Sequence, residues 1–210
     1  MNKLLTLFAN FIIQSIVKFS YIGIFLLMLL ESFNIPIPSE LVMTFSGFLS
    51  YKGDFNLYLV ILVGTLGNLL GSILSYYLGY YGGYPFLEKY GKYIFIQDKD
   101  IKKAHEWFDR YGEFAVFFTR VLPVFRTFIS LPAGIAKMDI KKFSLYTLLG
   151  ILIWDVVLAV LGFYFASKWT IIYHFVENFS IYFFIVIVLM IAVYIYRHMQ
   201  KSKRAKNLFQ

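Results

Sequence analysis

Two arginines and two prolines interrupt an otherwise almost wholly apolar stretch, residues 117–138. Arg120 and Arg126 are six residues apart, and Pro123 and Pro132 prevent the stretch from forming one continuous helix. An arginine at bilayer depth costs about 2.5–3.5 kcal/mol, so a pair persists only where it faces water, a carboxylate or an anionic ligand. A guanidinium offers two parallel donors that match a phosphate group. The stretch therefore predicts a re-entrant hairpin that presents the guanidinium groups of Arg120 and Arg126 to a negatively charged group.

Two glutamates enclose a second proline-containing interruption. Glu31 and Glu40 lie on either side of Pro36 and Pro38 within apolar sequence. In such surroundings a carboxylate either forms an ion pair with an arginine or carries a proton. The two states can exchange when a proton or a phosphate arrives, so both glutamates are candidates for proton coupling. The alternative is that the four charges only hold the two interruptions together, and we favour function because buried ion pairs are weak evidence for stability.

A fifth charge, Asp155, lies in an apolar segment directly after Trp154. Two interpretations have equal weight. Asp155 is a third proton site, or it is a packing group that hydrogen-bonds Asn68 or another residue of the first half of the chain.

Composition places these residues in an integral membrane protein. The 210 residues are 60% hydrophobic and 21% aromatic, and the mean hydropathy is +0.68. With no cysteine and three scattered histidines, neither a disulfide nor a metal site is expected, and no cofactor is predicted. The net charge of +8 fits contact with anionic lipid head groups better than nucleic-acid binding.

The predicted fold is a single all-α membrane domain, residues 1–210, with two re-entrant helical hairpins. Whether residues 1–18 span the membrane or lie at its surface is left open. Basic residues orient the chain, because the tail and the loop near residue 100 belong on the cytoplasmic side. The expected elements are an N-terminal helix (1–20), a first re-entrant hairpin (21–51), a transmembrane helix (55–81), a cytoplasmic loop with an amphipathic helix (84–112), a second re-entrant hairpin (113–138), transmembrane helices (143–167 and 178–197) and a basic tail (198–210).

An internal repeat supports this arrangement. An offset of 87 residues pairs Pro36 with Pro123 and Gly47 with Gly134, so the spacing from proline to glycine is 11 residues in both hairpins. The same offset pairs residues 68 and 155. Opposed hairpins from inverted halves are the architecture of secondary transporters. The residues expected to shape the hairpin turns and their backbone are Pro36, Pro38, Gly47, Pro123, Pro132 and Gly134.

The motifs around these charges resemble the DedA family, also called the SNARE-associated or VTT-domain family, over residues 20–170. They are Glu31 with Pro36-Ile37-Pro38-Ser39-Glu40, the run Phe118-Thr119-Arg120-Val121-Leu122-Pro123-Val124-Phe125-Arg126-Thr127, and Pro132-Ala133-Gly134-Ile135-Ala136-Lys137-Met138. The resemblance implies a lipid translocase in which Glu31, Glu40, Arg120 and Arg126 are functional. It also implies dependence on the proton motive force. The second acidic position of the family is often Asp after Pro-Gly, whereas this chain has Glu40 after Pro-Ser, which places it in a subgroup.

The expected function is therefore return of undecaprenyl phosphate across the cytoplasmic membrane of a bacterium, in a multi-pass protein whose C-terminus is cytoplasmic. The alternatives are translocation or scrambling of phosphatidylethanolamine or another phospholipid, and proton-coupled exchange of a small ion or drug. No nucleophile elbow, metal motif or phosphate-binding loop is present in the sequence, so an enzyme is not expected and an intramembrane lipid phosphatase has low weight. The expected partners are the membrane and a lipid phosphate, and a homo-oligomer is left open.

Overall fold

The structure is a computed structural model that describes residues 2–35, 37–83, 98–122 and 126–166. The predicted transmembrane helix at 178–197, the basic tail, Pro36 and Pro123 lie outside the described residues. Within the described ranges the fold is all-helical, which confirms the predicted class. The helices are α1 (Asn2–Ser32), α2 (Ser39–Tyr51), α3 (Leu57–Tyr77) continued by the π-helical turn η1 (Leu78–Gly83), α5 (Asp98–Val121), α6 (Ser130–Ile135) and α7 (Ile140–Tyr164).

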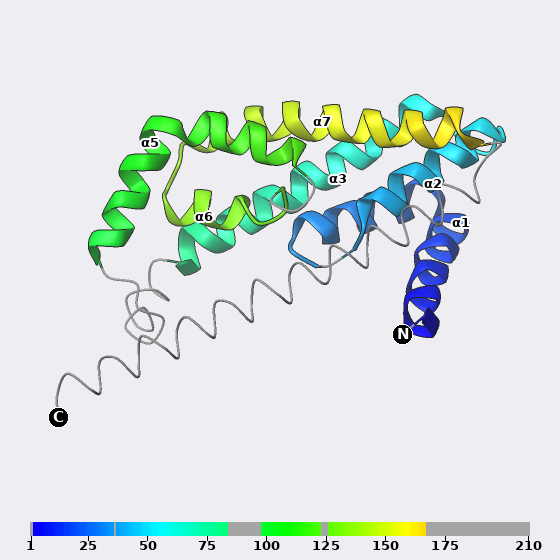
Figure 1. Cartoon of the computed structure of the whole chain (residues 1–210), viewed down its shortest axis with the longest axis horizontal. Helices are drawn as coiled ribbons and strands as arrows, with labels where there is room; N and C mark the ends of the chain where they lie inside the picture. The colour runs from blue at the N-terminus through cyan, green and yellow to red at the C-terminus, as the bar shows by residue number, and fades with distance from the viewer. Residues whose placement is uncertain (1, 36, 84–97, 123–125, 167–210) are drawn as a thin grey trace. The chain divides into compact units, whose positions relative to one another are not determined.

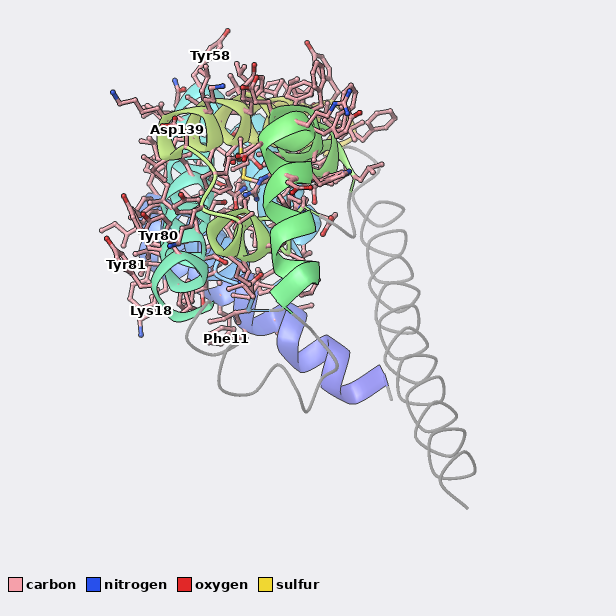
Figure 2. The ribbon with its side chains drawn as sticks, turned by 90° about the vertical axis from the view of Figure 1, so that its left-hand side faces the viewer. Phe11, Lys18, Tyr58, Tyr80, Tyr81 and Asp139 are labelled. Atoms are coloured by element: carbon pink, nitrogen blue, oxygen red, sulfur yellow. The ribbon has the colours of Figure 1, made fainter. Side chains whose placement is uncertain are left out.

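Three segments in the described part of the chain are long and apolar enough to cross a membrane: Ala9–Ser32, Leu57–Gly83 and Ile140–Tyr164. Exposed tyrosines mark both ends of the second segment, with Tyr58 81% and Tyr81 70% exposed; Figure 2 shows these two side chains pointing outward. They are 23 residues apart, or about 35 Å along a helix. That distance slightly exceeds a hydrocarbon core of about 30 Å, as expected for aromatic side chains at the two membrane surfaces.

Polar caps set the starts of α3 and α7. Asn56 and Asp139 immediately precede the two helices, and each side-chain oxygen accepts hydrogen bonds from the backbone N–H groups two and three residues later, at 2.9–3.2 Å. These bonds satisfy N–H groups that have no partner inside the helix.

Two helical hairpins lie against α3 and α7. The first joins the second half of α1 to α2, and the second joins α5 to α6. In Figure 1 the turns of the two hairpins approach each other from opposite sides. That either hairpin enters and leaves the membrane on one side stays a prediction.

The first hairpin begins at a break in α1 and turns at Pro38. Ser20 has non-helical backbone angles (φ 53, ψ −132), so α1 consists of two helical pieces. Asn34 has a positive φ of 66 in the turn, and its amide donates a hydrogen bond to Ser75 Oγ at 2.7 Å. Pro38 is extended (φ −75, ψ 104) and caps α2, which agrees with its predicted role in the turn.

The second hairpin differs from the prediction. The expected boundary between a loop ending at residue 112 and a hairpin starting at 113 is absent, because α5 runs without interruption from Asp98 to Val121. Gly112 lies within this helix, and a Cβ there would contact Phe108 and Met138 at 3.1 and 3.3 Å. Gly112 therefore leaves room for the Met138 side chain beside α5 and does not interrupt the helix. The second limb is short, since α6 has only six residues.

Gly47 and Gly134, which were expected to shape the hairpin turns and their backbone, do not lie in turns. Both glycines lie inside helices, Gly47 in α2 and Gly134 in α6. A Cβ on Gly47 would lie 2.1 Å from the carbonyl oxygen of Ala159, and one on Gly134 would lie 2.0 Å from that of Tyr76. The two positions need glycine because another helix backbone touches them, and not because the chain turns. Pro132, predicted to shape the turn, lies in the first turn of α6, where a missing N–H is tolerated.

These glycine contacts show that the two halves exchange partners. α2 of the first half packs on α7, whereas α6 of the second half packs on α3 and η1. The contact of Gly162 with Thr44 is matched by that of Gly79 with Leu131, at Cβ-to-oxygen distances of 2.0 and 2.3 Å. Residues 44 and 131 obey the predicted offset of 87, but the two glycines are 83 apart. Corresponding residues of the two hairpins are therefore 87 positions apart in the sequence. Corresponding contact glycines of the long helices are 83 positions apart, which is about one helical turn less.

Candidate functional site

Arg126 lies between the two carboxylates of the first hairpin. Its Nη2 is 2.6 Å from Glu31 Oε1 and 3.9 Å from Glu40 Oε1. The side chains of Arg126 and Glu31 are 6% and 5% exposed, and that of Glu40 is 16% exposed. Glu31 is in the last turn of α1, Glu40 is in the first turn of α2, and Arg126 lies in the turn between α5 and α6. One guanidinium thus connects the turns of both hairpins, as the ion-pairing alternative predicted.

Arg120 is equally buried but has different partners. Its Nη1 donates to the backbone oxygen of Arg126 and its Nη2 donates to Ser130 Oγ, both at 2.6 Å. Among the described residues it forms no ion pair within 4.0 Å, and its Nε has no hydrogen-bond partner. Arg120 therefore stabilises the turn of its own hairpin, and its positive charge is not neutralised by any carboxylate within 4.0 Å in the described part of the chain.

Helix α7 supports both arginines through one face. A Cβ on Gly150 would lie 2.5 Å from Cβ of Arg120, so only glycine admits that side chain. One turn later, the ring of Trp154 lies 5.2 Å from Cζ of Arg126, within range of a cation–π interaction. Trp154 was not among the site residues predicted from the sequence, although its position directly before the buried Asp155 was a usable signal.

Asp155 is fully buried and joins α7 to α3 through neutral donors. The amide nitrogen of Asn68 donates to Oδ1 at 3.2 Å and to Oδ2 at 3.3 Å, and the hydroxyl of Thr65 donates to Oδ2 at 3.2 Å. The predicted hydrogen bond to Asn68 is therefore present. The second interpretation of Asp155, a proton site, stays a prediction.

A hydrogen-bonded chain connects Asp155 to the arginine cluster. The hydroxyl of Ser32 lies 2.7 Å from Asn68 Oδ1 and 3.3 Å from Glu31 Oε2. One hydroxyl proton can serve only one of these two acceptors at a time. All five charged residues predicted from the sequence are thus brought into one buried region, and Ser32, Thr65 and Trp154 are additions that only the structure supplies.

Charged contacts outside this region are of a different kind. Lys142 Nζ lies 2.6 Å from Glu113 Oε1, and both side chains reach solvent. Hydrogen bonds from Lys142 and then from Tyr146 lower the pKa of the Glu113 carboxyl. This pair joins the C-terminal half of α5 to the first turn of α7, and exposure to solvent limits its contribution to stability.

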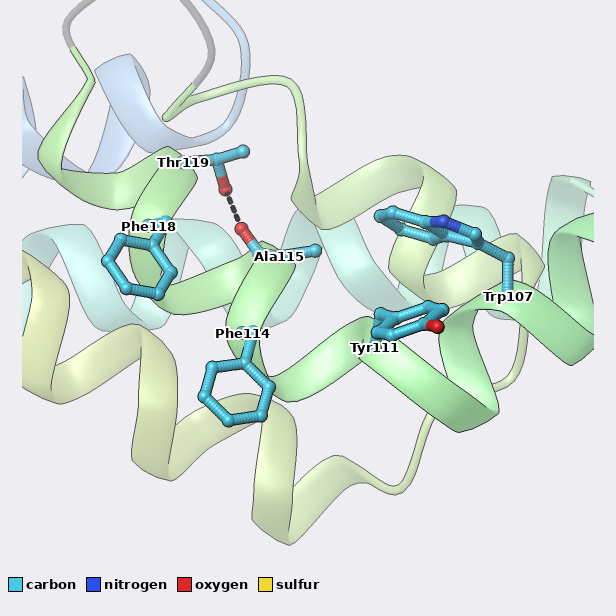
Figure 3. Close-up of a pocket in the computed structure, with 6 residues that line it drawn as sticks. All are labelled: Trp107, Tyr111, Phe114, Ala115, Phe118 and Thr119. Carbon is cyan, nitrogen blue, oxygen red and sulfur yellow. Dashed lines mark hydrogen bonds between the residues drawn. The ribbon is translucent and has the colours of Figure 1, made fainter.

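A shallow apolar groove of about 470 Å³ lies on the outer face of α5 (Figure 3). Two of the residues drawn there, Tyr111 and Thr119, carry hydroxyl groups. The Thr119 hydroxyl donates a hydrogen bond to the backbone oxygen of Ala115. The groove therefore offers hydrocarbon contacts and no charge. Its lining residues are Trp107, Tyr111, Phe114, Ala115, Phe118 and Thr119.

The fold and the cluster define an all-helical membrane protein with buried charges between two hairpins. A family model described as the VTT domain matches residues 37–164. The chain belongs to this VTT-domain family, the DedA family.

Several bacterial relatives match most of the chain. Undecaprenyl phosphate transporter A of Staphylococcus aureus is 32% identical, over 93% of this chain and 98% of the relative. A protein of the same name from Bacillus subtilis is 35% identical, over 87% and 90%. An alkaline phosphatase-like protein of Lactococcus lactis subsp. lactis is 34% identical, over 80% and 81%. No solved structure matches the chain.

Proposed function

We propose that this protein is a flippase that returns undecaprenyl phosphate across the bacterial cytoplasmic membrane, coupled to the proton motive force. The observation that carries the proposal is the guanidinium of Arg126, buried between Glu31 and Glu40 of the opposing hairpin. A buried cation held by exchangeable carboxylates suits an anion that must shed water to cross hydrocarbon. The names of the Staphylococcus and Bacillus relatives support this lipid.

Binding proceeds by competition for Arg126. In the described structure Glu31 occupies one nitrogen of the guanidinium, at 2.6 Å. Protonation removes the negative charge of the glutamate, so Arg126 is released to an arriving phosphate at no net loss of charge pairing. Loss of the proton restores the ion pair and expels the phosphate. Glu31 and Glu40 therefore exchange protons for phosphate.

The two glutamates divide this task. Glu31 makes the short contact and controls the availability of Arg126, whereas Glu40 is farther away and more exposed, and so exchanges protons with the aqueous phase. Acid outside the cell then favours loading from the outer leaflet, and the more alkaline cytoplasm favours release. The proposed orientation has the C-terminus in the cytoplasm.

A second candidate function is hydrolysis of the same lipid phosphate, which the name of the Lactococcus relative favours. Transport and hydrolysis leave different products. Transport preserves undecaprenyl phosphate, whereas hydrolysis releases inorganic phosphate and a neutral alcohol. A third candidate is translocation of phosphatidylethanolamine or another phospholipid. Comparing the binding of these lipids with that of undecaprenyl phosphate distinguishes it.

The test is binding of undecaprenyl phosphate to purified protein across pH 5–8, followed by transport in vesicles with an imposed pH gradient. Glu31→Gln mimics the protonated form, so it should bind the lipid, lose the pH dependence of binding and lose gradient-driven transport. Glu113→Gln, which changes a surface carboxylate, is the matched control and should behave as wild type.

Unchanged pH dependence in both Glu31→Gln and Glu40→Gln would remove these residues from coupling and leave Asp155 as the next candidate. Release of inorganic phosphate from the lipid by wild-type protein would favour the phosphatase. If phosphatidylethanolamine bound more tightly than undecaprenyl phosphate, the proposed substrate would be wrong and phosphatidylethanolamine would replace it.

A further inference from the structure

Several buried polar side-chain atoms have no hydrogen-bond partner, and one of them belongs to Arg120. Such atoms are uncommon in folded proteins, and each calls for an explanation, of which an absent ligand is one. Among the described residues, buried side-chain atoms without a partner are Asn34 Oδ1, Ser39 Oγ, Arg120 Nε, Thr147 Oγ1 and Trp154 Nε1.

Their places in the fold bring three of them to one site. Arg120 contacts α7 at Gly150, and Trp154 is one turn further along the same face. The ring of Trp154 lies 5.2 Å from Arg126 Cζ. Ser39 is fully buried and directly precedes Glu40, whose carboxylate lies 3.9 Å from Arg126.

The chemistry of these atoms specifies the missing partner. Arg120 Nε and Trp154 Nε1 are donors that cannot accept a hydrogen bond, so each requires an acceptor. Ser39 is the first residue of α2, a helix of 13 residues with no side-chain cap at Pro38. The N-terminus of such a helix favours negative charge, and the unpartnered Ser39 hydroxyl adds a further donor there. An anion with several acceptor oxygens would satisfy these donors together.

We propose that Trp154 and Ser39 complete the head-group site and make it selective for a phosphate monoester. The inference rests on the proposed function and assigns residues to the same site. A monoester has three terminal oxygens, which the released Arg126, Arg120 Nε and the Trp154 indole N–H can each contact, while Ser39 supports the charge from α2. A phosphodiester has only two free oxygens and a single negative charge, so it offers these donors fewer acceptor positions and less charge, and it binds more weakly.

Trp154 therefore has two separable functions. Its ring holds the guanidinium of Arg126 by a cation–π contact, and its N–H binds phosphate. Trp154→Phe keeps an aromatic ring beneath Arg126 and removes only the N–H. Trp107→Phe is the matched control, because Trp107 lies on the outer face of α5 and is 48% exposed.

The experiment measures binding of three probes to purified protein in detergent: undecaprenyl phosphate, phosphatidylglycerol as a diester, and inorganic phosphate. Loss of one hydrogen bond to a charged group predicts that Trp154→Phe and Ser39→Ala each weaken undecaprenyl phosphate binding by about tenfold. Phosphatidylglycerol binding should change less than threefold, and Trp107→Phe should match wild type. If inorganic phosphate bound as tightly as undecaprenyl phosphate, the proposal that the bound anion is a lipid head group would be wrong.

A second measurement leaves the site intact. The chain has three tryptophans, so Trp107→Phe combined with Trp169→Phe leaves Trp154 as the sole indole. Undecaprenyl phosphate should then shift the fluorescence of Trp154, and the shift should disappear with Arg126→Ala. No shift on saturation with undecaprenyl phosphate would overturn the inference even if the phenylalanine variant fails to fold.

The outcomes separate the two proposals. If wild-type protein does not bind undecaprenyl phosphate, the proposed function fails and the inference fails with it. If binding is lost in Arg126→Ala but is unchanged in both Trp154→Phe and Ser39→Ala, the inference alone is overturned.

Discussion

At the residue scale, the two arginines have distinct structural roles. Arg126 forms the ion pair with Glu31, whereas Arg120 donates to the backbone of the turn and to Ser130. Both are buried, so either charge would be costly without these contacts. The difference predicts separable effects of the same substitution at the two positions.

Arg126→Lys keeps a positive charge near Glu31 but loses the second parallel donor, so lipid phosphate affinity should fall at least tenfold while the fold is retained. Arg120→Lys should also lower the free energy of unfolding, by about 2 kcal/mol, since one ammonium cannot reproduce two fixed hydrogen bonds. Lipid binding and thermal unfolding in detergent measure the two effects. Arg110→Lys on exposed α5 is the control, and wild-type transport by both site variants would show that the arginines only balance charge.

At the element scale, glycine contacts hold each hairpin to the long helix of the other half. Gly47 and Gly162 join α2 to α7, and Gly134 and Gly79 join α6 to α3 with η1. Because the contacting atoms are backbone atoms, they cannot rotate away from an added methyl group. The hairpins are therefore held at fixed depth beside the helices, and Arg126 is held opposite Glu31.

Gly134→Ala should displace α6, because the new Cβ would lie 2.0 Å from the carbonyl oxygen of Tyr76. Overpacking of this kind costs about 1–3 kcal/mol. We expect a lower melting temperature in detergent and reduced transport. Gly82→Ala is the matched control, since no atom lies within 4 Å of a Cβ there; equal behaviour of the two variants would contradict the packing role.

At the scale of the whole molecule, we expect α3 and α7 to begin on opposite surfaces of the membrane. Figure 1 shows the two helices running in opposite directions. Lys137, Lys141 and Lys142 cluster at the start of α7, and basic residues favour the cytoplasmic side.

Single cysteines test this topology directly, because the natural chain contains none. Asp54→Cys, before α3, should react with a membrane-impermeant maleimide in intact cells. Lys141→Cys should react only after the membrane is permeabilised. The unmodified chain is the labelling control, and reaction of both cysteines from the same side would refute the opposed arrangement.

The sequence by itself determined the class of protein and the charged residues of the candidate site. Hydropathy and the cost of a charge in hydrocarbon are properties of local sequence, so Arg120, Arg126, Glu31, Glu40 and Asp155 stand out without a structure. The same holds for the long apolar helices. For Asp155 the sequence left two alternatives, a proton site or a hydrogen bond to Asn68 or another residue of the first half. Sequence shows that a buried carboxylate needs hydrogen-bond donors, but it does not show which residues supply them.

Tertiary structure alone decided which of these groups meet. Arg126 and Glu31 are 95 residues apart, and local sequence contains nothing that distinguishes Arg126 from Arg120 as the partner. Gly47 and Gly134, expected to shape the hairpin turns and their backbone, lie inside helices instead, and the sequence could not show this because a glycine that permits a turn and one that admits a neighbouring backbone are identical in sequence. Trp154 and Ser39 became candidates only from the structure, because whether a buried polar atom has a hydrogen-bond partner depends on atoms from different helices.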